Sequence, residues 1–239
     1  MKLVEIKEIS GTITLKTGLH IGAGDIEMHI GGTDNPVIKH PFTHEPYIPG
    51  SSLKGKVRSL LELKSGLMGL TNGDPISLKI VNSLSDVEQK KEALKIIKLF
   101  GTSASESDGL EKEPIGPARV SFSDCELDEE IREKIKEGKM VYSEIKAENS
   151  INRITSTAKN PRFTERVPAG IKFRFLITLK KFQEDKDDLE DLLLTGLKLL
   201  EFDALGGNGS RGYGRVKFKF DDDELNKKFK NILPFKKGD

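Results

Sequence analysis

Hydrophobic and polar residues alternate strictly in three stretches of the chain, a pattern that predicts β-strands with one buried face. The stretches run from Ile9 to Leu15, from Phe173 to Leu179 and from Val216 to Phe220. Shorter apolar segments at Pro46–Ile48 and Val120–Phe122 indicate two further strands. The predicted strands therefore come from the beginning, the middle and the end of the chain.

Apolar residues recur at helical spacing in four other stretches. Gly50–Ser51–Ser52 opens the first helix, with Ser51 or Ser52 expected as its N-cap. The apolar positions of the four helices are Leu53, Val57, Leu60 and Leu61; Ala93, Ile96, Ile97 and Phe100; Ile131 and Ile135; and Leu189, Leu192, Leu193, Leu197 and Leu200. Because strands and helices are mixed without a regular alternation, the sequence predicts an α+β fold rather than a doubly wound sheet.

The length of 239 residues suits one large domain with insertions. No stretch approaches the length needed to span a bilayer, and the first residues lack a signal-peptide pattern. Cys125 is the single cysteine, which excludes an intramolecular disulfide and a cysteine-rich zinc site. We therefore expect a cytoplasmic protein with no membrane partner.

The formal net charge is only +1 at pH 7, so bulk charge does not indicate a nucleic-acid partner. Lys and Arg nevertheless gather in three segments that also carry Gly, Ser, Asn or Thr, which can hydrogen-bond phosphate. A solvated surface accounts for any one of them, but three such segments at turns or element ends favour one anionic ligand. They are Lys54–Arg58, Arg153–Arg166 and Arg211–Lys219, whereas acidic residues cluster at Asp124–Glu137, Glu184–Asp191 and Asp221–Glu224.

Two glycine-rich motifs resemble nucleotide-binding signatures without completing them. Gly50–Lys56 matches the first seven places of a phosphate-binding P-loop, but Val57 stands where Ser or Thr would hold magnesium, so an NTPase is disfavoured. The motif can still bind a nucleic-acid phosphate at a helix N-terminus, or simply cap a helix. Gly207–Gly212 matches a dinucleotide fingerprint, but no βαβ unit can follow it. Its glycines indicate close backbone approach to a ligand beside Arg211, or a tight turn.

Asp34 and the histidines are the candidates for chemistry. Asp34 precedes Asn-Pro, which is ordinary turn chemistry, but a loop carboxylate can also bind a divalent metal or accept a proton from an RNA 2′-OH. The histidines could provide acid and base for metal-free RNA cleavage, yet surface or packing roles are favoured and a histidine-only zinc site is weakly supported. They are His20, His29, His40 and His44.

Together these motifs resemble the backbone RAMP subunits of type III-A CRISPR (Csm) complexes. The resemblance rests on Ile30–Leu61, Asn152–Arg153, Glu165–Gly170 and Gly206–Gly214, and it covers nearly the whole chain. It implies one domain over residues 1–239 with a modified ferredoxin-like (RRM-like) palm, lid insertions at about residues 22–46 and 64–116, and a thumb at about residues 145–170.

The resemblance implies a subunit that stacks with further copies of itself and other Csm subunits along a CRISPR guide RNA. The thumb would displace bases at regular intervals, and Asp34 with a divalent metal, Mg²⁺ or Mn²⁺, would support cleavage of the target RNA. Which thumb residue wedges between bases stays open, with Ile154 one candidate. The implied RNA-binding residues are Ser51, Ser52, Lys54, Lys56, Arg58, Asn152, Arg153, Arg166, Arg211 and Arg215.

Two alternatives remain. The chain could be a non-catalytic guide-RNA scaffold, as in relatives that lack the aspartate. It could also be a metal-independent guide-processing RNase that uses His20 or a neighbouring residue. Asp34 discriminates the first alternative from a target-RNA nuclease, and activity in EDTA would indicate the second.

Overall fold

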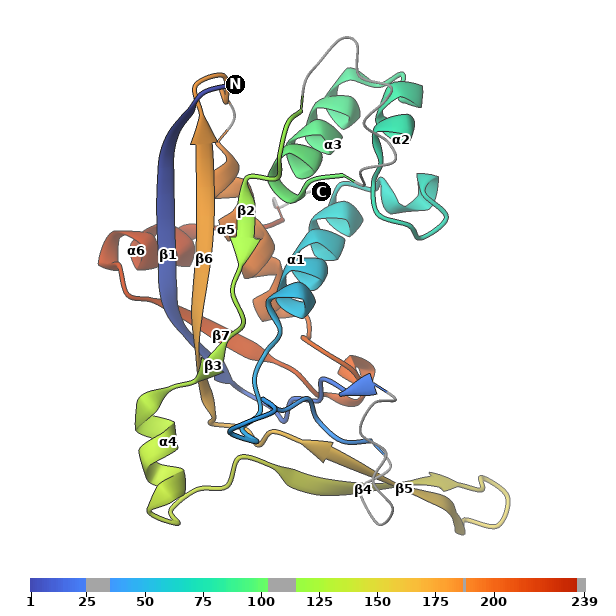
Figure 1. Cartoon of the computed structure of the whole chain (residues 1–239). Coiled ribbons are helices and arrows are strands. Elements are labelled where there is room, and N and C mark those ends of the chain that lie inside the picture. The colour runs from blue at the N-terminus through green and yellow to red at the C-terminus, as the bar shows by residue number, and fades with distance from the viewer. Residues whose placement is uncertain (25–34, 103–114, 187, 236–239) are drawn as a thin grey trace.

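The structure is a computed structural model that describes residues 1–24, 35–102, 115–186 and 188–235 (Figure 1). Mixed helices and strands confirm the predicted α+β class. In chain order the elements are β1 (Leu3–Leu15), α1 (Gly50–Lys64), α2 (Leu78–Ser83), α3 (Val87–Phe100), β2 (Val120–Phe122), β3 (Glu126–Leu127), α4 (Glu129–Lys136), β4 (Glu144–Ile151), β5 (Ala158–Arg166), β6 (Lys172–Phe182), α5 (Leu189–Phe202), β7 (Val216–Phe220) and α6 (Asp223–Asn231). Short 3-10 helices cover Met68–Leu70 and Gly209–Arg211.

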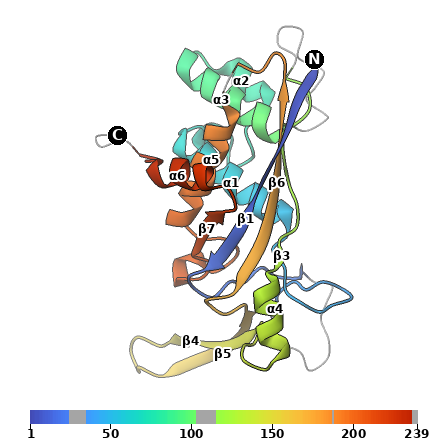
Figure 2. The same cartoon turned by 90° about the vertical axis from the view of Figure 1, so that its left-hand side faces the viewer.

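The main sheet is built around β1, which pairs antiparallel with β6 on one side and β7 on the other. Both β2 and β3 pair antiparallel with β6. Ile13 lies opposite Phe173 on β6 and Phe218 on β7, so the three side chains share one face. Helices α1, α3 and α5 lie on that side of the sheet (Figure 2), and the alternation read from the sequence marks this buried face.

The opposite face of the sheet is polar. Thr12 lies opposite Arg174 on one side and Lys219 on the other, and all three are at least partly exposed. Antiparallel sheets commonly have one face packed on the core and the other solvated. This is why apolar and polar residues alternate along the strands. Helix α5, in contrast, is rich in leucine because most of its side chains are buried.

A second, two-stranded sheet forms a hairpin that projects from the rest of the protein. Strands β4 and β5 pair from Glu144 with Arg166 at the base to Ile151 with Ala158 near the turn. The hairpin points away at the end of the molecule opposite α2 and α3 (Figures 1 and 2). It occupies the stretch in which the thumb was expected.

Several local expectations differ from the structure. Strand β1 begins at Leu3 rather than Ile9, and the sequence reading missed α2 and α6. Residues 46–48 do not form a regular strand, because they make only isolated bridges, from Pro46 to Lys39 and from Ile48 to Cys125. Pro46 at the start of this segment and Pro49 just after it lack the N–H groups that a longer ladder would need. Within the described ranges, no helix is long and apolar enough to cross a membrane.

Candidate nucleic-acid interface

A carboxylate, rather than a serine, meets the N-terminus of α1. Asp124 Oδ1 accepts a hydrogen bond from Gly50 N–H at 2.7 Å. The N-cap residue is Pro49 and makes no side-chain cap, so the expectation that Ser51 or Ser52 caps this helix is wrong. A Cβ on Gly50 would lie 2.2 Å from the Phe122 carbonyl oxygen. Glycine is therefore needed at position 50, because the start of α1 lies very close to the backbone of β2. Asp124 therefore occupies one of the free N–H groups at the positive end of the α1 dipole.

Three cations on α1 were predicted to bind RNA, and the structure places them in different surroundings. Lys54 is half-buried, and burial followed by the nearby Arg58 charge lowers its pKa. Lys56 pairs with Asp203 at 2.7 Å. Arg58 binds Glu62 at 2.7 Å and the carbonyl oxygens of Gly101 and Ile76 at 3.1 and 2.8 Å. Arg58 therefore ties α1 to its neighbours, whereas Lys54 has no ion pair within the described part of the chain and Ser51 is exposed.

The turn of the hairpin is shaped by Asn152. Its side-chain oxygen accepts hydrogen bonds from Ile154 N–H at 2.9 Å and Thr155 N–H at 3.2 Å. This Asx arrangement holds the turn locally. Arg153 is exposed, and Ile154 is 95% exposed, which is unusual for an isoleucine. The hairpin thus presents one cation and one apolar side chain at its tip.

The glycine-rich loop is joined to the base of the hairpin through Tyr213. The ring is buried, with Lys146 Nζ 4.6 Å and the Arg166 guanidinium 5.0 Å from its centroid. Arg166 also pairs with Glu144 at 2.6 Å. Cations over an aromatic face attract the ring electrostatically. Arg166, predicted to bind RNA, therefore also holds the loop against β4 and β5.

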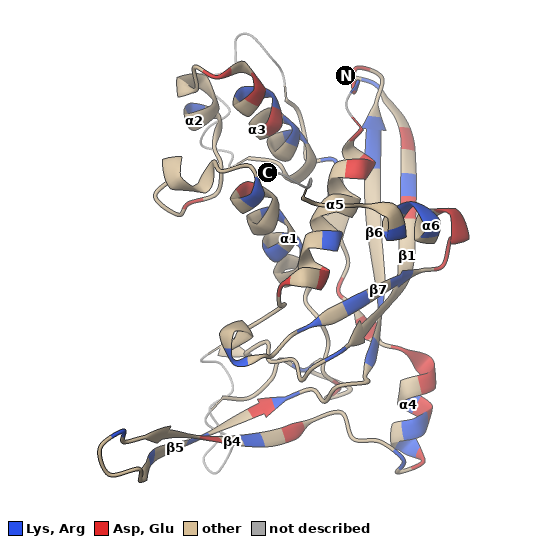
Figure 3. Cartoon of the chain, turned by 180° about the vertical axis from the view of Figure 1, so that it is seen from behind, with Lys and Arg blue, Asp and Glu red and all other residues tan. Residues whose placement is uncertain are grey.

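The remaining predicted cations follow the glycines. Arg211 pairs with Glu148 on β4 at 3.1 Å, whereas Arg215 is exposed without an ion pair to any described residue. A hollow of about 390 Å³ opens between hairpin and loop, lined by Glu148, Asn149, Ser150, Asn160, Arg162 and Arg211. Seen from behind, basic residues lie on α1, β7 and the hairpin, interspersed with acidic ones (Figure 3).

Asp34 and His29 lie outside the described residues, and the segments before residue 25 and after residue 34 contact each other. Gly22 bridges Val37, and Ile38 N–H donates to Ile21 O at 2.8 Å. The two flanking segments therefore pair with each other. Within the described ranges, no group of three or more His, Cys, Asp or Glu side chains could hold a metal ion.

The described histidines make local contacts. His20 Nδ1 lies 2.7 Å from the Glu165 carbonyl oxygen. His40 Nδ1 accepts from Phe42 N–H and Thr43 N–H at 3.3 and 3.4 Å. His44 sits in the same exposed turn with a φ of 55°. These contacts favour packing and turn roles for His20, His40 and His44.

Glu165 is the residue near this surface that sequence reasoning gave no role. Its carboxylate accepts from Lys39 Nζ at 2.7 Å and from Val37 N–H at 3.0 Å. The residue is 7% exposed. A charged residue in an otherwise ordinary hairpin gives no signal of burial, so its partners become visible only in three dimensions.

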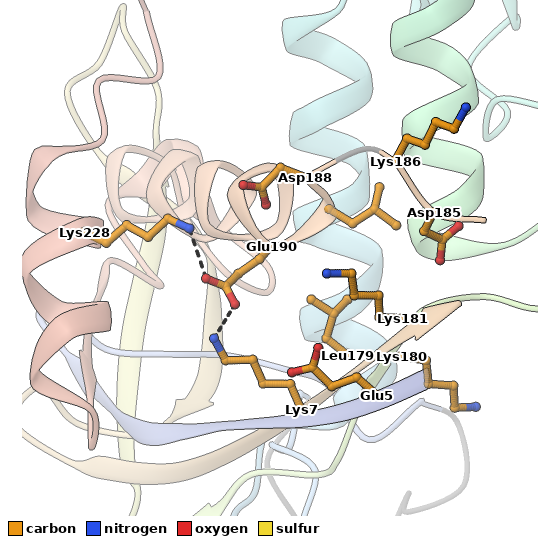
Figure 4. Close-up of a pocket in the computed structure, with 11 residues that line it drawn as sticks. Glu5, Lys7, Leu179, Lys180, Lys181, Asp185, Lys186, Asp188, Glu190 and Lys228 are labelled. Atoms are coloured by element: carbon orange, nitrogen blue, oxygen red, sulfur yellow. Dashed lines mark hydrogen bonds and ion pairs between the residues drawn. The ribbon is translucent and has the colours of Figure 1, made fainter. Parts of the chain in front are cut away.

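A separate charged cavity of about 380 Å³ lies at the other end of the sheet, beside α5 and α6 (Figure 4). Glu190 lies between Lys7 and Lys228, bonded to both, at 3.0 Å from Lys228 Nζ. Five lysines and four carboxylates line this cavity, and none of the predicted RNA-binding residues is among them. Its charges therefore nearly compensate one another and do not extend the hairpin surface.

The chain is an α+β protein with a one-sided antiparallel sheet, a projecting hairpin and a glycine-rich loop at the hairpin base. A family model for the RAMP superfamily matches residues 12–217, and the chain belongs to this family.

Two curated relatives and one solved structure show which members of the RAMP superfamily this chain is similar to. The chain is 43% identical over 224 residues to the "CRISPR system Cms endoribonuclease Csm3" of Methanothermobacter thermautotrophicus, covering 88% of this chain and 82% of that protein. It is 38% identical over 222 residues to the protein of the same name from Streptococcus thermophilus, covering 92% and 89%. The crystal structure of a Csm3–Csm4 subcomplex of the type III-A CRISPR-Cas interference complex is similar, with a TM-score of 0.54, 28% identity and coverage of 98% and 99%.

Proposed function

We propose that this chain is the guide-RNA-binding backbone subunit of a type III-A CRISPR complex and cleaves complementary target RNA at regular intervals. The observation that carries the proposal is similarity over most of both chains to proteins named as Csm3 endoribonucleases. Its partners are then the guide RNA, the target RNA, further copies of the chain and other Csm subunits. Because such a complex acts on RNA inside the cell, the proposal places the chain in the cytoplasm.

Guide binding is supported by cations that lie at the hairpin and near the glycine loop. Arg153 and Arg215 are exposed, and Lys54 is half-buried beside the exposed Ser51. Contacts of this kind with phosphates and sugars carry no sequence information, which suits a subunit that must accept any guide. Arg58 supports this surface indirectly, because its hydrogen bonds hold α1 in place.

The hairpin tip is suited to separate bases. Ile154 projects from a turn whose backbone Asn152 holds, and apolar side chains inserted between bases unstack them. Displacing a nucleotide distorts the strand, and in-line attack by a 2′-OH needs such a distorted backbone. Ile154 is therefore our candidate for the wedge that sets the spacing of the cuts.

Asp34 is our candidate for the catalytic carboxylate. A loop aspartate can accept the proton of the attacking 2′-OH, or orient a metal ion beside the phosphate. A bound Mg²⁺ or Mn²⁺ would stabilise the negative charge that develops on the phosphate. The reaction would break the bond from phosphorus to the 5′-oxygen and form one to the 2′-oxygen, so RNA would be cut and DNA would not.

The proposal is tested with the reconstituted guide-loaded complex and a labelled complementary RNA. Wild type should produce regularly spaced cuts with Mg²⁺ and none in EDTA, and Asp34→Ala should abolish them while guide binding persists. Asp74→Ala changes an exposed aspartate in another turn and should cut at the wild-type rate.

Three other results would change the proposed function or its mechanism. Tight guide binding without cutting by the wild-type complex would leave the scaffold alternative. Cutting of repeat RNA by the isolated chain in EDTA would favour the metal-independent guide-processing RNase. Full-rate cutting by Asp34→Ala would remove Asp34 from the mechanism.

A further inference from the structure

A positively charged hollow of about 430 Å³ lies where β1 ends, β7 begins and α5 ends. Its charged lining residues are one carboxylate, Glu201, and four cations, Lys16, Lys198, Arg215 and Lys217. The cations exceed the carboxylate by three charges, whereas the cavity beside α5 and α6 has five lysines and four carboxylates. An anionic ligand is therefore attracted to this hollow far more than to that cavity.

The one carboxylate of the hollow is engaged inside the protein. The Glu201 side chain is 5% exposed, and its Oε2 lies 2.8 Å from Lys217 Nζ and 3.4 Å from Lys198 Nζ. Oε1 accepts from Phe218 N–H at 2.9 Å. Glu201 thus offsets these two lysines and ties the end of α5 to β7.

Lys16 and Arg215 carry the charge that remains for a ligand. Both residues are exposed, and neither has an ion pair to a residue within the described ranges. Lys16 N–H donates to Arg215 O at 2.7 Å, and Arg215 N–H donates to Thr17 Oγ1 at 3.0 Å. Because these hydrogen bonds hold the two residues together before a ligand arrives, less ordering is needed on binding.

Phe202 gives the same hollow an aromatic surface. It is the last residue of α5 and is 65% exposed, whereas most leucines of that helix are buried, so packing does not account for it. Its neighbour in the chain, Asp203, pairs with Lys56 on α1 at 2.7 Å. Two cations that were predicted to bind RNA, Lys56 and Arg215, therefore adjoin Phe202 and its chain neighbour.

We propose that this hollow binds one unpaired nucleotide of single-stranded RNA, with the base stacked on Phe202 and the adjoining phosphates held by Lys16 and Arg215. The inference rests on the proposed RNA-binding function and deepens it, since neither Phe202 nor Lys16 was predicted from the sequence. Every base has a π-face, so an aromatic side chain among cations binds single strands with little regard to sequence. This property suits a subunit that must accept any guide.

Stacking is tested by comparing two oligomers of equal length: an oligouridylate and a ribose-phosphate oligomer in which hydrogen replaces every base. Fluorescence anisotropy with the purified chain gives both Kd values. Phe202→Ala should weaken oligouridylate binding about 5- to 100-fold, the loss expected for one stacked base, and keep the Kd for the baseless oligomer within about 2-fold of wild type. Phe202→Tyr retains an aromatic face and should bind both oligomers as wild type does.

The salt dependence of binding tests the cations. Each phosphate contact that is lost should lower the slope of log Kd against log salt concentration by about 0.7 for a single strand. Lys16→Gln should show this decrease with both oligomers. Phe202→Ala removes no charge and should keep the wild-type slope.

Two exposed residues outside the hollow provide matched controls. Phe235→Ala removes a phenylalanine that is 61% exposed, and Lys181→Gln removes an exposed lysine of β6. Both variants should bind the two oligomers as wild type does. Equal losses in Phe202→Ala and Phe235→Ala would refute the site, because they would not depend on the hollow.

The assembled complex identifies the strand that supplies the nucleotide. 4-Thiouridine is placed at successive positions of either the guide or the target RNA, and the crosslinked peptides are identified by mass spectrometry. A crosslink to the peptide that contains Phe202 from one of the two RNAs supports the site and assigns it to that strand. No crosslink from either RNA would overturn the inference.

The remaining outcomes separate this inference from the function on which it rests. If wild type binds oligouridylate and Phe202→Ala binds it equally well, the stacking site is refuted and RNA binding stands. Equal losses of both oligomers in Phe202→Ala would also refute stacking. An altered oligomeric state of Phe202→Ala with unchanged RNA affinity would show that another protein surface covers Phe202 instead. If wild type binds neither oligomer, the proposed RNA-binding function fails and the site fails with it.

Discussion

The hydroxyl group of Tyr213 donates a hydrogen bond to Glu148 Oε1 at 3.0 Å, which joins the glycine-rich loop to strand β4. Glu148 in turn pairs with Lys146 and Arg211, each at 3.1 Å. Burial and the neighbouring Glu148 carboxylate raise the pKa of Tyr213 above its ordinary value, so the hydroxyl keeps its proton at physiological pH. Loop and hairpin base therefore behave as one unit.

Tyr213→Phe should remove this hydrogen bond and keep the ring. A net hydrogen bond contributes about 1 kcal/mol, and Glu148 retains two cationic partners, so we expect a loss of about 1 kcal/mol in the free energy of unfolding. Urea denaturation of the two proteins measures the difference. Tyr213→Ala also removes the buried ring and should cost about 3–5 kcal/mol. A Phe variant as unstable as the Ala variant would contradict the account.

Two glycines of α1 should respond in opposite directions to alanine. A Cβ at position 50 would lie 2.2 Å from Phe122 O, whereas at position 55 nothing lies within 4 Å. Gly50→Ala should therefore destabilise by about 1–3 kcal/mol through overpacking. Gly55→Ala should stabilise by about 0.5–1 kcal/mol, because alanine restricts the unfolded chain and favours helix. Thermal unfolding distinguishes them, and a stable Gly50→Ala would refute the close approach.

Asp185 should make stability depend on acid pH. It pairs with the buried Arg119 at 2.8 Å, and although burial raises its pKa, hydrogen bonds from Arg119 and Phe182 N–H hold the pKa below its ordinary 3.8. A depressed pKa contributes stability above about pH 4, and this contribution is lost as pH falls through the folded-state value.

Asp185→Asn tests this contribution by leaving Arg119 buried without its counter-charge. The variant should lose about 3–5 kcal/mol at neutral pH, and the difference from wild type should shrink below about pH 4. Denaturation curves between pH 3 and pH 7 measure it. A difference that stays constant over that range would show that ionisation of Asp185 does not matter.

Ile154 should matter for RNA and not for folding. Its side chain is 95% exposed, so Ile154→Ser should change the free energy of unfolding by less than about 0.5 kcal/mol. Target cutting by the assembled complex should fall, because a serine cannot hold two bases apart. Ile145→Ser, an exposed position at the hairpin base, is the matched control. Equal effects of the two changes would exclude Ile154 as the wedge.

The sheet was predictable because a single-sided sheet imposes a period of two on its strands. Ile9–Leu15, Phe173–Leu179 and Val216–Phe220 all lie within strands of the structure. The two hairpin strands show no period of two in the sequence, because most of their side chains are exposed on both faces. The thumb was predicted in this stretch only from the resemblance to RAMP subunits. Exposed strands escape pattern reading since burial creates the pattern.

The candidate site was harder to predict than the fold. The sequence shows that Arg58 and Arg215 are cations, but only the structure shows Arg58 hydrogen-bonded to Gly101 O and Ile76 O while Arg215 stays exposed. Likewise, Glu165 lies 126 residues from Lys39 in the chain, and no local rule relates them. Asp34 lies outside the described residues, so its role stays a prediction.

The central strand β1 is synthesised well before both of its partners, β6 and β7. Leu3 pairs with Phe182, and Thr12 pairs with Lys219. During synthesis, the two edges of β1 stay unpaired until β6 and β7 have been made, which exposes them to aggregation. A fragment that ends before β6 cannot close the sheet, so a prematurely terminated chain should be degraded rather than assembled.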